Sequence, residues 1–293
     1  MQNKVPTKKL NTGYKIPMVG LGVWKNDNSV EEMQELLQKA FDVGYRHIDT
    51  AIAYENEEVI GEALENIFKK GEYKREDIFI TSKCFPKKDE NIKDMVKKSL
   101  SKLRTKYLDL YLLHWSACPI GDNLEIKHKP VHEVWKELEE CVDQKLIRSI
   151  GVSNYNVQSL FDLLSYAKIK PAMNQIELHA YLQQPDLIAF CKKFDIQVTA
   201  YSPIGRGKLL EDEQIKQIAE KYHKTPAQIA LHYLNVNLDL IVIPKTANPE
   251  RLKENIDWQD FKLEKNDVEQ LKKLDQDKRF VKPNELFDVP LFD

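Results

Sequence analysis

The residues best suited to chemistry are an acid, a tyrosine, a lysine and a histidine that end or follow short apolar segments. In "HIDTAIAY", residues 47–54, Asp49 ends an apolar run and Tyr54 follows within reach of one turn. An acid at the end of a buried strand loses hydration unless a cation meets it, and we expect Lys83 to be that cation. Taken singly, Asp49 could cap a helix, Lys83 could extend to the surface and His114 could be a hydrogen-bonded core histidine.

The elements that must position these residues alternate between short β-rich segments and longer segments of helical period. Eight segments are typical of strands: 18–24, 47–50, 78–83, 108–115, 147–154, 172–179, 198–203 and 240–246. Between them, apolar residues recur at steps of three and four, as in amphipathic helices. This alternation runs without a linker or composition break, and it predicts an α/β fold in which one (β/α)8 TIM barrel spans residues 1–293. A doubly wound parallel sheet is the alternative.

Two segments lie outside the eightfold pattern. The stretch "KKLNTGYKIPMV" has two short apolar runs around Asn11, Thr12 and Gly13, which predicts an N-terminal β-hairpin that could plug the lower mouth of the barrel. Residues 263–276 predict an extra amphipathic C-terminal helix before an irregular tail.

In a barrel of this kind, active residues stand at the carboxyl ends of the strands. The expected strand ends carry the polar residues Asp49, Lys83, His114, Ser153, Asn154, Tyr201, Ser202, Lys245 and Thr246. Gln175 lies within the sixth strand. Convergence on one face favours a shared site over separate structural roles. The chain contains no H-E-x-x-H, lipase-type G-x-S-x-G, P-loop or G-x-G-x-x-G motif.

Composition excludes several classes of function. The 44 basic and 46 acidic side chains leave a formal charge of -2, which indicates neither nucleic-acid nor anionic-membrane binding. No stretch approaches the ~20 apolar residues needed to cross a bilayer, and the start of the chain lacks a secretory apolar region, so we expect a cytoplasmic protein. The four cysteines have no metal-ligand spacing and fit reduced thiols. A metal-dependent hydrolase would need clustered His and Asp ligands that the strand ends lack.

Longer motifs resemble the aldo-keto reductase family. They run in order from about residue 15 to residue 280: "GYRHIDTAIAYENEEVIGEAL", "FITSK", "LDLYLLHW", "IGVSNY", "NQIELH", "YSPIGRG" and "IPKTANPERLKEN". The chain is similar to compact microbial-type members, and also to aldose reductase and xylose reductase. The resemblance implies a (β/α)8 barrel and an oxidoreductase that reduces aldehydes or ketones to alcohols with NADPH.

The family's catalytic tetrad corresponds to Asp49, Tyr54, Lys83 and His114. The resemblance implies that Tyr54 donates the proton that the carbonyl oxygen needs as it gathers charge. A neighbouring ammonium, Lys83, should stabilise the phenolate and lower the pKa of Tyr54. A neutral imidazole at His114 should orient the substrate and stabilise the developing oxyanion.

The resemblance also implies a site for NADPH/NADP+. Tyr201 would stack on the nicotinamide, and Ser153, Asn154 and Gln175 would hold its amide. The backbone of Ser202, Pro203, Ile204 and Gly205 would approach the pyrophosphate. Asn248 is expected to cap a helix with Pro249 at its first position. That helix start and its neighbours would bind the 2′-phosphate and adenine through Lys245, Thr246, Arg251, Glu254 and Asn255.

Aromatic residues after three strands should line the substrate pocket beside His114. They are Trp24, Phe85 and Trp115, which favour apolar or aromatic substrate portions. Phe85 stands where many family members have Trp, and Ser116 where Pro is common. The segment after the seventh strand is short. The sequence therefore does not identify the substrate, because the conformations of segment 116–130 and of the tail after Arg279 determine which substrate binds. We expect a monomer; the alternative function is an NADPH-binding sensor with little turnover.

Overall fold

A computed structural model shows eight parallel strands closed into a barrel, and it describes residues 5–120, 124–246, 248–258, 260–289 and 291–292. In chain order the barrel strands are β3 Leu21–Gly22, β4 His47–Asp49, β5 Phe79–Cys84, β6 Leu108–Leu113, β7 Ile147–Ser153, β8 Met173–Glu177, β9 Gln197–Tyr201 and β10 Ile241–Ile243. Each pairs with the next, and parallel bridges from Val19 to Val242 and from Gly22 to Lys245 close the ring. The barrel prediction is confirmed, and the doubly wound sheet is excluded.

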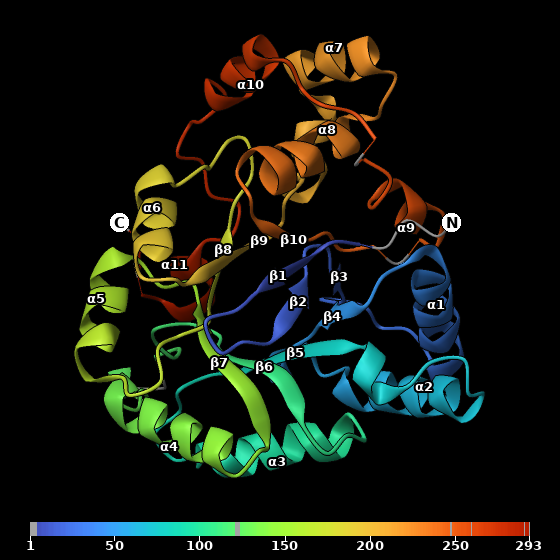
Figure 1. The fold of residues 1–293 in the computed structure, drawn as a ribbon. Coiled ribbons are helices and arrows are strands. Elements are labelled where there is room, and N and C mark those ends of the chain that lie inside the picture. The colour runs from blue at the N-terminus through green and yellow to red at the C-terminus, as the bar shows by residue number, and fades with distance from the viewer. Residues whose placement is uncertain (1–4, 121–123, 247, 259, 290, 293) are drawn as a thin grey trace.

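Helices surround this ring (Figure 1). They are α1 Val30–Val43, α2 Glu57–Lys69, α3 Ile92–Lys102, α4 Val131–Asp143, α5 Val157–Tyr166, α6 Pro185–Lys193, α7 Glu213–Tyr222, α8 Pro226–His232, α9 Glu250–Glu254, α10 Lys265–Lys272 and α11 Pro283–Phe287. The start of α1 shows why they form where they do. Ser29 and Glu32 make a capping box there, and the buried Met33, Leu37 and Phe41 recur on one face.

A β-hairpin covers the amino ends of the barrel strands, as predicted. Strands β1 (Thr7–Lys9) and β2 (Lys15–Pro17) pair antiparallel and lie across the middle of the ring in Figure 1. The Asn11 amide donates to the carbonyls of Pro171 and Asp195 at 3.0 and 3.1 Å, so the turn is fastened to the barrel. Behind the hairpin, an inner core is formed by Leu10, Ile16, Phe79, Leu110, Leu112, Ala172, Met173 and Ile241.

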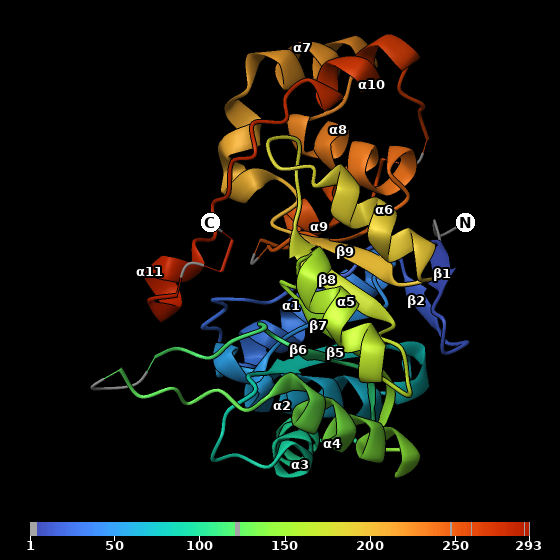
Figure 2. The same ribbon diagram turned by 90° about the vertical axis from the view of Figure 1, so that its left-hand side faces the viewer.

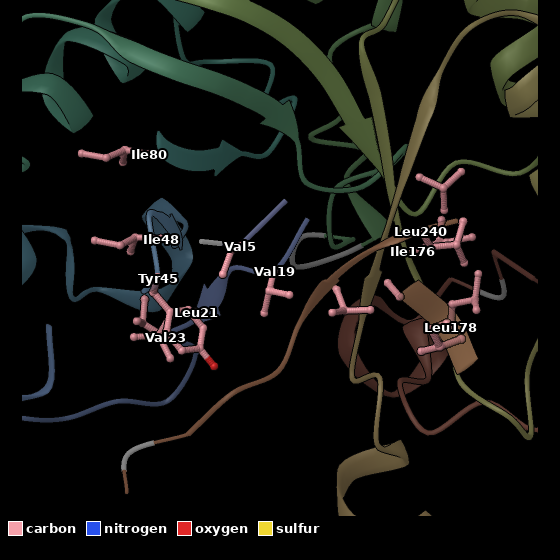
Figure 3. Close-up of a cluster of buried hydrophobic side chains, with 14 of the residues drawn as sticks. Val5, Val19, Leu21, Val23, Tyr45, Ile48, Ile80, Ile176, Leu178 and Leu240 are labelled. Atoms are coloured by element: carbon pink, nitrogen blue, oxygen red, sulfur yellow. The ribbon is translucent and has the colours of Figure 1, made fainter. Parts of the chain in front are cut away.

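A second, larger core lies between the strands and the helices. Figure 3 shows part of it, with Val19, Leu21, Ile48 and Ile80 among the labelled side chains of the first strands. Burial of each such aliphatic side chain stabilises the fold by about 1.5–3 kcal/mol. Packing on both faces of the strands holds their carboxyl ends as a rigid platform for polar side chains.

The C-terminal region adds two helices outside the eightfold pattern. Helix α10, which was predicted, is tied to α7 because Lys221 and Tyr222 both donate to the carboxylate of Asp267. The chain then reaches α11, which lies at the opposite end of the barrel from β1 and β2 (Figure 2). Helix α11 therefore stands at the carboxyl ends of the strands, where active residues are expected.

Candidate active site

A buried ion pair between neighbouring strands forms the centre of the site. Lys83 on β5 donates to Asp49 Oδ1 on β4 at 2.5 Å and to the carbonyl of Thr50 at 2.9 Å. The Lys83 side chain is fully buried and that of Asp49 is 3% exposed. The structure thus places Lys83 as the cation that meets Asp49. Because both side chains are buried, hydrogen bonds within the protein replace the water that each charge loses on folding.

Tyr54 completes this cluster. It ends a short 3-10 helix, Ile52–Tyr54, and its hydroxyl lies 3.3 Å from Lys83 Nζ. Burial raises the pKa of Tyr54 above its ordinary value, while Lys83 lowers it and Asp49 raises it. The expectation of a net lowered pKa is wrong for this structure, because it counted the ammonium but not the loss of hydration. Tyr54 therefore holds its proton at neutral pH.

Lys83 remains the charged partner of this pair. Burial, the largest influence, lowers the pKa of Lys83, but Asp49 and Tyr54 together raise it above its ordinary value. The ammonium therefore persists at neutral pH. A fixed positive charge beside a neutral phenol is suited to stabilise a phenolate whenever the proton leaves.

His114 follows β6 and faces the same cluster. Its backbone N–H donates to the carbonyl of Cys84 at 2.7 Å, and its ring centroid lies 5.6 Å from that of Tyr54. Burial and the charge of Lys83 hold the pKa of His114 well below its ordinary value, so the imidazole is neutral. Its Nδ1 is buried and has no hydrogen-bond partner among the described residues. A neutral ring of this kind can donate one N–H to a carbonyl oxygen.

Polar residues from β7, β8 and β9 extend the cluster. Gln175 Nε2 donates to Asp49 Oδ2 at 2.7 Å, and Ser153 Oγ donates to the carbonyl of Gln175 at 2.8 Å. Tyr201 Oη donates to Asn154 Oδ1 at 2.7 Å. The structure brings these four predicted cofactor residues together beside the ion pair. Their sequence pattern did not indicate that Gln175 also holds the second oxygen of Asp49.

The segment predicted to approach a pyrophosphate forms a tight turn after β9. The Gly205 N–H donates to the carbonyl of Ser202 at 2.8 Å, with Pro203 and Ile204 between them. Gly205 has a φ of +56°, and a Cβ there would lie 3.1 Å from the ring of Phe280. Glycine therefore suits both the conformation and the close approach of the C-terminal chain.

A third group of predicted residues follows β10. Helix α9 begins at Glu250, one residue later than predicted. Pro249 therefore precedes the helix and does not occupy its first position. The side chain of Asn248 still accepts from the N–H of Glu250 at 2.9 Å. Thr246 is buried and hydrogen-bonded to the backbone of Asn248.

Two exposed cations stand beside this turn. Lys245 and Arg251 form no ion pair with any residue that the structure describes. Glu254 accepts a hydrogen bond from Thr225 Oγ1 at 2.6 Å, and Asn255 is buried. Free cations over a hydroxyl and a turn fit an anionic group such as a phosphate.

Aromatic side chains flank His114 as expected, and one of them was not anticipated. Phe85 lies 5.1 Å from His114 between ring centroids, and Trp115 is buried. Phe287 of α11 lies 5.7 Å from Phe85 and 5.0 Å from Trp115. Trp24 is 39% exposed, and the guanidinium of Arg206 lies over its ring. Phe287 belongs to an irregular tail without periodicity, so no sequence signal placed it here.

The described part of the chain holds neither a candidate metal site nor a membrane-spanning helix. There, no group of three or more His, Cys, Asp or Glu side chains is arranged to hold a metal ion. None of the described helices is both long enough and apolar enough to span a membrane. In segment 116–130, Ile120 bridges Ile126, and residues 121–123 lie outside the described residues.

Comparison with known proteins identifies the family. The model of the aldo/keto reductase family matches residues 18–276. The chain is 42% identical to aldose reductase B of Dictyostelium discoideum, over 98% of each chain, and 38% identical to the NAD(P)H-dependent D-xylose reductase I,II of Candida tropicalis, also over 98% of each.

Solved structures agree with this match. The aldose reductase of Schistosoma japonicum superposes with a TM-score of 0.90 at 36% identity, over 98% of each chain. The aldo-keto reductase of Bombyx mori, solved in complex with NADP, gives a TM-score of 0.89 at 33% identity over 99% of each chain. The chain therefore belongs to the aldo/keto reductase family.

Proposed function

We propose that Asp49, Tyr54, Lys83 and His114 are the catalytic residues of an NADPH-dependent reductase of aldehydes or ketones. The chain's membership in the aldo/keto reductase family establishes the class, an NADP-dependent oxidoreductase acting on small carbonyl compounds. The assignment of roles to residues rests on one observation. A fully buried lysine bonds both an acid, at 2.5 Å, and a tyrosine hydroxyl, at 3.3 Å.

Tyr54 supplies the proton in this proposal. When bound, the nicotinamide supplies a hydride, and the carbonyl oxygen then gathers negative charge that must be neutralised. Tyr54 is protonated at neutral pH because burial raises its pKa. Lys83 stabilises the phenolate that remains, and Asp49 stabilises Lys83 against the cost of burial.

His114 orients the substrate. Its neutral imidazole avoids placing a second cation beside Lys83, and an N–H of the ring can hydrogen-bond the carbonyl oxygen. Phe85 and Trp115 stand next to this point and offer apolar contacts to the rest of the substrate.

The cofactor would lie across the carboxyl ends of the strands. Ser153, Asn154 and Gln175 present amide and hydroxyl groups suited to a carboxamide, and Tyr201 offers an aromatic face. The pyrophosphate would be held by the turn at residues 202–205. The donor set at Lys245, Thr246 and Arg251 fits the 2′-phosphate that distinguishes NADPH from NADH. Glu254 and Asn255 would contact the adenine.

Finer properties complete the proposal. We infer a single barrel domain over residues 1–293 that acts as a cytoplasmic monomer. The four cysteines are free and buried, which suits a reducing compartment. Support for a monomer comes from the site, whose proposed residues all come from one chain.

Turnover separates this proposal from a cofactor-binding sensor. NADPH and NADH oxidation would be followed with a panel of aldehydes and ketones, using wild type and Tyr54→Phe. We expect Tyr54→Phe to lose at least about a hundredfold in kcat while NADPH affinity, measured by quenching of protein fluorescence, stays within about twofold. Cofactor binding without turnover of any carbonyl by the wild type would favour the sensor instead.

A further inference from the structure

Glu177, the last residue of β8, is a buried acid that the catalytic cluster does not use. Its side chain is fully buried. Oε1 accepts from Phe280 N at 2.7 Å and from His179 Nε2 at 3.1 Å, and Oε2 accepts from Val281 N at 3.0 Å. A carboxylate removed from water requires such donors. Two of the three donors belong to the C-terminal segment, defined here as residues 276–289.

Neighbouring contacts fasten the start of the C-terminal segment to the same place. The N–H groups of Gln276 and Lys278 both donate to the carbonyl of Tyr181, at 3.1 and 3.0 Å. The ring of Phe280 lies 5.0 Å from that of His179. Compared with these neutral hydrogen bonds, the two made to the Glu177 carboxylate are charge-assisted and therefore the stronger ones.

Beyond Val281, the C-terminal segment reaches the substrate side of the barrel. Phe287 of α11 packs against Phe85 and Trp115, at 5.7 and 5.0 Å between ring centroids. Its carbonyl also accepts from the N–H of Ile120 at 3.3 Å. The position of Phe287 thus depends on where the chain at Phe280 and Val281 is held.

We propose that Glu177 is a positioning residue that holds the C-terminal segment over the site and thereby favours carbonyl substrates with an aromatic or large apolar group. The inference rests on the proposed function, because that function assigns Phe85 and Trp115 to the substrate pocket. Large apolar substrates would contact Phe287 and depend on its position. Small polar aldehydes would reach Tyr54 and His114 without contacting Phe287.

Glu177→Gln tests this directly, because it keeps the shape of the side chain but replaces one acceptor oxygen with an NH2 group that cannot accept. We expect the KM for 4-nitrobenzaldehyde to rise about tenfold with kcat within about twofold, while the KM for glyceraldehyde changes less than about twofold. Trypsin should also cut faster after Lys278 and Arg279. Glu285→Gln, a change of an exposed residue in the C-terminal segment, serves as the matched control and should leave both KM values, kcat and the rate of cleavage unchanged.

A double variant distinguishes positioning from general stability. Phe287→Ala should reproduce the rise in KM for 4-nitrobenzaldehyde. Adding Glu177→Gln to Phe287→Ala should raise that KM little further. If Glu177→Gln does not fold, Val281→Pro removes one of the two donors from the other side. The proposal would be overturned if Glu177→Gln raised the KM for both aldehydes equally. Additive effects of the two substitutions on KM, or an unchanged rate of trypsin cleavage, would also overturn it.

The two proposals fail in different ways. If the wild type reduces neither aldehyde, the proposed function fails. It also fails if Tyr54→Phe reduces both aldehydes as fast as the wild type does. If reduction depends on Tyr54 while Glu177→Gln leaves the ratio of the two KM values unchanged, only the role of Glu177 is refuted. Trypsin cleavage reports the hold on the C-terminal segment independently of catalysis.

Discussion

Lys83→Met removes the ammonium that lies 3.3 Å from Tyr54 Oη while keeping a side chain of similar length in a fully buried position. Two unit charges at that separation interact by about 5 kcal/mol at an effective dielectric of about 20, or roughly 4 pK units as an upper limit. Burial already raises the pKa of Tyr54. Without Lys83 the phenolate is less stable still, so the pKa of Tyr54 should rise further.

The reverse reaction reports this pKa most clearly. Oxidation of an alcohol with NADP+ needs Tyr54 as a phenolate base, so the rate should rise with pH up to the pKa of Tyr54. In Lys83→Met the midpoint should move upward, and turnover near neutral pH should fall by about 10²–10⁴. Lys83→Arg keeps a positive charge, so its turnover near neutral pH should fall less than that of Lys83→Met.

A further variant separates catalysis from stability. Lys83→Met leaves the Asp49 carboxylate buried without its cation, which costs about 3–5 kcal/mol of folding free energy. Asp49→Asn combined with Lys83→Met removes both charges and should restore much of that stability without restoring turnover. A pH midpoint in Lys83→Met within about half a unit of wild type would refute the electrostatic role of Lys83.

Three further outcomes are expected. Arg251→Ala should raise the KM for NADPH about tenfold and leave the KM for NADH nearly unchanged, in steady-state assays with each cofactor. Gln175→Leu should lower kcat about tenfold, because Asp49 loses its 2.7 Å hydrogen bond, and equal kcat in the two proteins would contradict that role. Burial lowers the pKa of His47 to about 4, so its contribution to stability is present above pH 6.5 and is lost as the pH falls towards 4. Chemical denaturation should show a loss of about 2 kcal/mol between pH 7 and pH 5 from this residue, and His47→Gln should flatten that dependence.

The barrel and the ion pair were predictable because local patterns determine them. Alternating strand and helix periods specify eight βα units, and the barrel rule places Asp49, Lys83 and His114 at the same end. Two oppositely charged residues buried on adjacent strands are then expected to form an ion pair, because each would be costly to bury alone. The hairpin was predictable for a similar local reason, the Asn11 to Gly13 turn between two short apolar runs.

Other features depend on contacts between distant residues and were not predictable. The pKa of Tyr54 is set by burial that only the folded chain creates, so the expected direction was wrong. Glu177 and Phe280 are 103 residues apart, and no period connects them. Phe287 lies against Phe85 and Trp115, which are also distant in sequence, and the irregular tail gave no indication of this position.

The central claim is that Tyr54 donates the proton during carbonyl reduction. The most direct test is a single turnover of the NADPH-loaded protein with 4-nitrobenzaldehyde, followed by the loss of NADPH fluorescence in wild type and Tyr54→Phe. We expect the substitution to slow NADPH oxidation by at least about a hundredfold while leaving NADPH affinity within about twofold. A single-turnover rate in Tyr54→Phe within about threefold of wild type would contradict the account.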